Sequence, residues 1–88
     1  MQDENLTTAH RIADVLTERI VSGALPPDAP LRQDHIAREF NSSHVPVREA
    51  FRQLEALYLV VAAPRRGVRV APLDAKSTKE IVEMRVAL

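Results

Sequence analysis

Arginines gather in one part of this 88-residue sequence, although its formal net charge is zero. Residues 32–71 contain seven arginines, four carboxylates and no lysine, which gives a net charge of +3. Residues 1–31 have a net charge of −3, with two arginines against five carboxylates. Arginine presents a planar fork of donors that fits phosphate oxygens and the O6 and N7 atoms of guanine. The pattern therefore predicts that residues 32–71 bind nucleic acid.

Two of these arginines, Arg48 and Arg52, stand four residues apart in a segment with helical periodicity. Apolar residues repeat there at relative positions 0, 3, 4 and 7, which places them on one face of a helix: Val47, Ala50, Phe51 and Leu54. Because the apolar stripe faces the core, the two arginines face solvent or DNA. The simpler alternative is a solvated helix face whose arginines pair with Glu49 and Glu55.

The sequence gives little indication of metal binding, catalysis or membrane insertion. The sequence has no cysteine, which excludes a disulfide framework and a thiolate metal site. His10, His35 and His44 lack the spacing of metal ligands, and Ser43 beside His44 has no third group to make a catalytic nucleophile. We therefore expect no enzyme, and neither a metal nor a cofactor in this fragment. No apolar run has the length of a membrane helix, so we expect no membrane contact and a cytoplasmic protein.

The remaining sequence divides into elements that would position the arginines. A first helix is expected at 8–22, capped by Thr7 or Thr8 and ended by Gly23. A proline-rich turn at 25–30 precedes a short helix at about 33–40, which Asn41 ends in a left-handed conformation. A third helix at about 44–57 has Ser43 as its N-cap and Pro46 in its first turn.

Two β-branched runs, 59–63 and 68–71, flank the turn PRRG and predict a hairpin. The fold class is thus mainly α with a small β-hairpin. It is a winged helix-turn-helix of three helices and a two-stranded wing. The second helix of such a pair enters the major groove with its first residues toward the bases. The expected core is aliphatic with two phenylalanines: Ile12, Leu16, Ile20, Ile36, Phe40, Val47, Phe51, Leu54, Leu59 and Val70.

The run IAREFNSSHVPVREAFRQLEALYLVVAAPRRGVRVAPL resembles the DNA-binding domain of GntR-family regulators, and IVSGALPPDAPLRQDHIA fits the same pattern. The tail LDAKSTKEIVEMRVAL is similar to the start of the effector domain in the FadR-like (FCD) branch. Departures from the family pattern are His44, where arginine is usual, and Asp28, Asn41 and Tyr58, where glycine is common. Gln33 stands where many relatives have a serine cap.

The resemblance implies two regions, a winged helix-turn-helix at 8–72 and a linker at 73–88 that begins a truncated helical effector-binding domain. It implies a transcription regulator, most often a repressor, which binds double-stranded DNA at a short palindromic operator as a homodimer. A small acid or sugar acid would act only through the missing C-terminal domain. The expected DNA-binding residues lie in the second and third helices and the wing: Gln33, Ser43, His44, Val45, Pro46, Arg48, Arg52, Arg65, Arg66 and Gly67.

Two other functional classes remain open. A winged helix can serve as a protein-interaction module that never touches DNA. The neutral net charge favours this slightly, whereas the placement of the arginines and the motif match oppose it. Alternatively, the domain could precede an aminotransferase-like enzyme, an arrangement also found in the broad family. The helical pattern of EIVEMRVAL, directly after the wing, opposes that arrangement.

Overall fold

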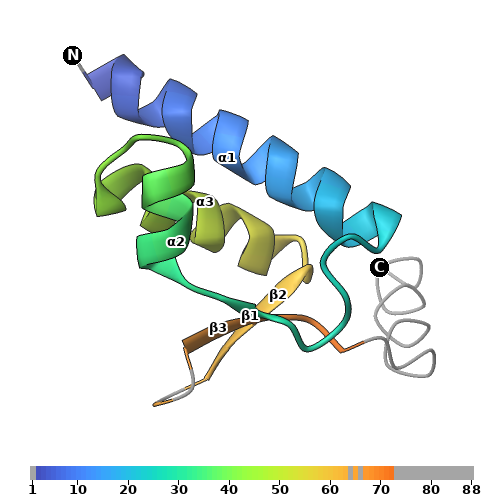
Figure 1. Cartoon of the computed structure of the whole chain (residues 1–88). Coiled ribbons are helices and arrows are strands. Elements are labelled where there is room, and N and C mark those ends of the chain that lie inside the picture. Colours follow the sequence, from blue (N-terminus) through green and yellow to red (C-terminus); the bar gives the residue numbers. More distant parts are fainter. Residues whose placement is uncertain (1, 64, 66, 73–88) are drawn as a thin grey trace, which may run out of the picture.

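A computed structural model of the chain describes residues 2–63, 65 and 67–72. Helix α1 runs along one side of this part of the chain, helices α2 and α3 lie beside it, and the strands lie on the side away from the N-terminus (Figure 1). The elements follow the order α1 (Gln2–Ser22), β1 (Pro30–Leu31), α2 (Gln33–Glu39), α3 (His44–Ala56), β2 (Val60–Ala63) and β3 (Gly67–Val70). The expected fold class is confirmed, while the expected effector-domain start at 73–88 lies outside the described residues.

Helix α1 begins six residues before the position expected from the sequence. Thr7 and Thr8 therefore lie inside the helix and do not cap it. No glycine or proline precedes Gly23 in the sequence, so nothing stops the helix from extending toward the N-terminus. The expected end is confirmed, because Gly23 follows the helix with a φ of 87° and donates its N–H to the carbonyl of Ile20.

The wing contains a third strand that the sequence analysis did not predict. The sheet is antiparallel with the order β1-β3-β2, so β1 pairs with the outer edge of the hairpin. Hydrogen bonds from Asp28 N–H to the Val70 carbonyl and from Val70 N–H to the Ala29 carbonyl extend this pairing. Strand β1 has only two residues, too few for an alternating pattern, and one is Pro30, which is confined to an edge strand. Such a strand forms because β3 offers it a partner.

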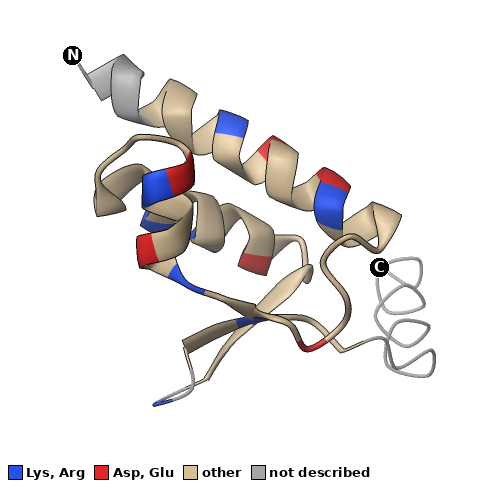
Figure 2. Cartoon of the chain, viewed as in Figure 1, with Lys and Arg blue, Asp and Glu red and all other residues tan. Residues whose placement is uncertain are grey.

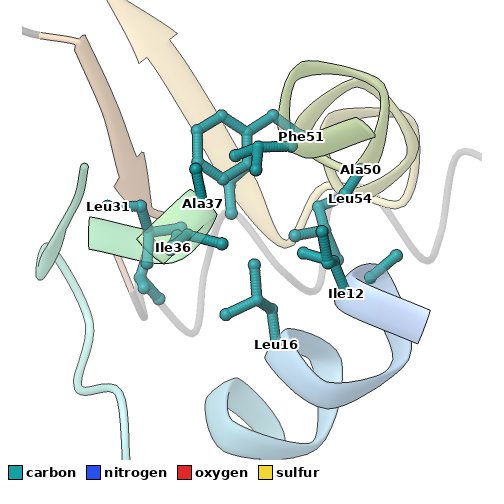
Figure 3. Packing of buried hydrophobic residues seen from close by; sticks show 12 residues of the cluster. Ile12, Leu16, Leu31, Ile36, Ala37, Ala50, Phe51 and Leu54 are labelled. Carbon is teal, nitrogen blue, oxygen red and sulfur yellow. The ribbon is translucent and has the colours of Figure 1, made fainter. Parts of the chain in front are cut away.

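One apolar cluster holds the helices and the sheet together. Side chains from α1, β1, α2 and α3 converge on a common centre, with the ring of Phe51 among them (Figure 3). Seven of the ten expected core residues are buried, and Ile20, Phe40 and Leu59 pack against the cluster while partly exposed. Ala37 and Ala50, on the inner faces expected for the second and third helices, are buried as well. Four further buried residues were not predicted from the sequence: Ala9, Ala13, Leu31 and Val60.

Helices α2 and α3 end in the same way with different residues. In each, the first residue past the cap has a left-handed backbone, with φ of 52° at Asn41 and 61° at Tyr58. The N–H groups of Ser42 and Leu59 then bond back to the carbonyls of Ala37 and Leu54. This is the Schellman arrangement, for which glycine is the usual residue. Asn41 confirms the expectation, whereas Tyr58 adopts the same conformation without a side chain suited to it.

Candidate nucleic-acid interface

Helices α2 and α3 form a helix-turn-helix whose second helix has one buried and one exposed face. Four residues, 40–43, join the helices, and Ile36 of α2 shares the core cluster with Val47 of α3. On the other side of α3, Arg48 and Arg52 are exposed. The first turn also presents Val45, which is 53% exposed although it is apolar. An exposed valine there fits contact with a thymine methyl group in the major groove.

The start of α3 differs from the expected cap. Ser43 has the extended backbone of an N-cap, with φ −77° and ψ 178°, but its side chain makes no cap hydrogen bond. A capping hydroxyl bonds to the N–H of the second or third helical residue, and here the third is Pro46, which has no N–H. Ser43 therefore occupies the expected N-cap position, but the expectation that its side chain caps the helix with a hydrogen bond is wrong. Within the described chain, the exposed hydroxyl is left for another partner.

Pro46 serves the interface indirectly, because its side chain is fully buried. It cannot present a surface to a ligand. Its ring instead packs in the interior, with its backbone pre-set for the first helical turn. This places Val45 and His44 on the outside.

The wing and the helix pair meet at an open crevice. One part is lined by Gln33, Asp34, Arg32 and the wing residue Arg69, and the adjoining part by Gln33 with Arg48 and other α3 and wing residues. Gln33 lies in both parts, where the helix pair and the wing come together. The structure thus brings the expected residue Gln33 next to the arginine face of α3. Sequence reasoning had not included Arg32, whose position directly before α2 was the available signal.

Most of the arginines on the helix pair and the wing have no carboxylate partner in the described part of the chain. Arg32, Arg38, Arg48 and Arg65 take part in none of the ion pairs found in the described part of the chain. Arg52 is 3.9 Å from Glu49, and its side chain is 79% exposed, so this contact is weak. Figure 2 shows arginine positions on α2, α3 and the wing, and both signs along α1. Unpaired, exposed arginines of this kind can neutralise phosphates without first breaking a contact.

Arg65 and Gly67 lie at the tip of the wing, as expected. Both have a left-handed backbone, with φ of 68° and 71°, and Arg65 is exposed. Arg66, the other expected wing contact, lies outside the described residues.

Arg69 has a structural role that differs from that of the wing-tip arginine. Its Nη1 atom lies 3.4 Å from the Asp28 carbonyl oxygen and 3.6 Å from the Asp28 carboxylate. Asp28 itself has a positive φ of 69° in the turn before β1. The guanidinium therefore ties this turn to strand β3.

Arg19 of α1 and Glu39 of α2 form a bidentate ion pair between their helices. Arg19 donates from Nη1 at 3.1 Å to one carboxylate oxygen and from Nη2 to the other. The hydrogen bond to Arg19 lowers the pKa of Glu39, the partial burial opposes this, and the Coulomb attraction adds to it. The same contacts raise the pKa of Arg19. This arginine holds the helix pair against α1 and is committed to its partner.

His44, the first residue of α3, has a partner on α2. Its Nε2 atom lies 3.2 Å from Oδ1 of Asp34, and both side chains are largely exposed. The contact joins the first turns of the two helices. Sequence reasoning had treated His44 alone, because Asp34 lies ten positions earlier in the chain.

The described residues include no group of three or more histidine, cysteine, aspartate or glutamate side chains placed to hold a metal ion. None of the described helices is long and apolar enough to span a membrane.

These elements define a class: a winged helix-turn-helix in which the exposed face of α3, the start of α2 and the wing form one arginine-bearing surface. The family model for bacterial regulatory proteins of the gntR family matches residues 8–70. The chain therefore belongs to the GntR family and carries the DNA-binding domain of a transcription regulator. The matched residues are those of a regulatory protein and not of an enzyme.

Curated relatives are similar over nearly the whole chain. It is 42% identical over 82 residues to the probable D-xylose utilization operon transcriptional repressor of Paenarthrobacter nicotinovorans, covering 93% of the chain and 36% of that protein. It is 38% identical to the gluconate operon transcriptional repressor of Bacillus subtilis (strain 168), covering 93% of the chain and 33% of that protein. The chain thus spans about a third of the length of these relatives.

Solved structures show the same fold. A GntR-family regulator from Pseudomonas syringae pv. tomato str. DC3000 has 36% identity and a TM-score of 0.72, over 91% of this chain and 34% of that one. The DNA-binding domain of AraR, crystallised with its operator ORR3, has 20% identity and a TM-score of 0.68, over 73% of this chain and 78% of that one. At this identity the likeness to AraR concerns the fold alone.

Proposed function

We propose that the chain is the operator-reading domain of a transcriptional repressor. The observation that carries this is the exposed first turn and outer face of α3, where Arg48 is free of ion pairs within the described chain. Helix α3 would lie in the major groove with its N-terminus toward the bases. The names of both curated relatives, each an operon repressor, support repression over activation.

The expected site residues take distinct roles in this proposal. His44, Val45 and Arg48 would face base edges, whereas Ser43, Gln33 and Arg52 would contact the phosphate backbone. Arg65, Arg66 and Gly67 would bring the wing to the neighbouring backbone or minor groove. We add Arg32 and Arg38 as phosphate contacts because both are exposed and unpaired within the described residues. Pro46 would position this set without touching DNA.

The full-length protein would be a cytoplasmic homodimer of the FadR-like (FCD) branch that binds a short palindromic operator. The chain covers about a third of its relatives, which leaves room for the effector-binding domain that the proposal requires. A small sugar or sugar acid is the proposed effector class, in keeping with the sugar and sugar-acid operons named for those relatives. Two linked DNA-binding domains would gain affinity through their effective concentration.

The test selects binding sites from randomised duplexes with the 88-residue chain and then measures affinity for the selected site. Arg48→Ala is expected to weaken binding by roughly tenfold or more, as for the loss of one specific contact. Arg11→Ala is the matched control, because Arg11 is an exposed arginine of α1, outside the helix pair and the wing. We expect it to change affinity by less than about twofold, since screening limits the effect of a distant surface charge.

The competing function is the protein-interaction module favoured by the neutral net charge. It predicts that no duplex is enriched. It also predicts that residual binding weakens equally in the Arg48→Ala and Arg11→Ala variants. Either result would overturn the proposed function.

A further inference from the structure

The contact between Asp34 and His44 joins the two helices at the surface where α3 would meet DNA. The Nε2 and Oδ1 atoms are 3.2 Å apart, and the side chains are 49% exposed for His44 and 73% exposed for Asp34. A pair this exposed adds little to the stability of a domain. The contact matters instead for the orientation of the His44 imidazole on this surface.

A carboxylate beside one ring nitrogen determines what a histidine can offer at the other. The Asp34 carboxylate lies beside Nε2 of His44, which favours a ring orientation with Nε2 toward α2 and leaves Nδ1 as the remaining polar atom of the ring. In the described part of the chain, Asp34 is the one partner found for the His44 side chain. Nδ1 accepts a hydrogen bond when the ring is neutral and donates one when it is protonated. Either state can distinguish base edges in the major groove.

Asp34 is otherwise poorly placed for a DNA-binding protein. It lines the crevice between the helix pair and the wing, together with Arg32 and Gln33. An unpaired carboxylate there would repel phosphates and oppose the arginines around it. Its contact with His44 gives the carboxylate a partner and restricts the positions that the imidazole takes on this surface.

We infer that Asp34 is a positioning residue that holds His44 for base readout, so that the two side chains determine operator specificity as one unit. The inference rests on the proposed function and deepens it by naming a specificity determinant on α2, outside the reading helix. Asp34 acts here through His44, whose Nδ1 faces the base.

The experiment compares the sites selected from randomised duplexes by the unmodified chain, Asp34→Ala, His44→Ala and the double variant. Each single variant is expected to lose about tenfold of base preference at the same position of the half-site. The double variant is expected to lose no more than either single one, because coupled residues are non-additive. Asp34→Asn keeps an oxygen that can accept from Nε2–H and should retain most of the preference.

Two controls separate this role from a general charge effect. Asp14→Ala removes an exposed carboxylate of α1 and should leave the selected base unchanged. Circular dichroism melts of every variant verify that the exposed substitutions leave the fold intact. If Asp34 merely repels DNA, Asp34→Ala will strengthen binding to all duplexes alike and leave the preferred base as it was.

Three outcomes bear against the inference. A uniform gain in affinity for Asp34→Ala, or additive losses in the double variant, contradicts the inference while the proposed function stands. Failure of the unmodified chain to enrich any duplex contradicts the proposed function, and the inference with it.

Discussion

The two faces of helix α3 show how one short element serves two purposes. Toward the interior, Val47, Ala50 and Leu54 are fully buried and Phe51 is 7% exposed. Toward the outside, Arg48 and Arg52 are exposed, and among the described residues the ion pair found for Arg52 is a long one, 3.9 Å from Glu49. The inner face contributes stability through buried apolar area, and the outer face contributes charge and hydrogen-bond donors. Because helical spacing separates the two sets, substitutions on one face should leave the property of the other nearly unchanged.

The largest effect is expected on the inner face, from Phe51→Ala. Removing a buried phenylalanine costs about 3–5 kcal/mol, most of the free energy of unfolding of a small domain. A thermal or denaturant melt measures it, with Arg48→Ala as the outer-face control. If Phe51→Ala unfolds at the same temperature or denaturant concentration as the unmodified chain, the division between the two faces is wrong.

A smaller effect is expected where α3 ends, at Tyr58. Tyr58 is 54% exposed, so it lies on the outer surface. Its backbone is nevertheless left-handed, with a φ of 61°, so the residue type at this position affects the free energy of unfolding. Tyr58→Gly should be more stable than Tyr58→Ala by about 1 kcal/mol, since only glycine avoids the cost of the left-handed conformation.

The alanine variant is the matched control for Tyr58, because it also removes the side chain and its contacts but keeps Cβ. Chemical denaturation of both variants provides the comparison. Equal stability of the two would show that the helix end relaxes to another conformation when the tyrosine is removed.

The smallest effect concerns the paired arginine, Arg19, whose partner Glu39 has a lowered pKa because of the hydrogen bond between them. A carboxyl whose folded pKa is depressed stabilises the fold above its unfolded pKa, and that contribution is lost as the pH falls through the folded value. Both side chains are more than a third exposed, so we expect less than about 1 kcal/mol.

The measurement for this pair is the free energy of unfolding between neutral pH and about pH 3, below the ordinary range of a glutamate carboxyl. The unmodified chain should lose more stability over this range than Glu39→Gln, which cannot ionise at that position. Identical pH profiles would show that the pair contributes nothing. DNA affinity at neutral pH should change little in Glu39→Gln, in contrast to Arg48→Ala.

Much of this arrangement is readable from local sequence signals. The apolar repeat of α3 predicted its buried face, Gly23 and Asn41 predicted two helix ends, and the PRRG turn predicted the wing. These signals work because each depends on the chemistry of a few neighbouring residues. The start of α1 was misjudged because Thr7 and Thr8 can cap a helix but need not, and no residue before them breaks it.

The sequence by itself determined the helix-turn-helix, the wing and the arginine face, since periodicity and backbone preferences act over short distances along the chain. Only the tertiary structure decided which arginines of the chain are committed to partners, because Arg19–Glu39 and Arg69–Asp28 join residues far apart in the sequence. The same holds for strand β1, which exists through its pairing with β3, and for the contact of His44 with Asp34. Each depends on distances across the fold that no local pattern encodes.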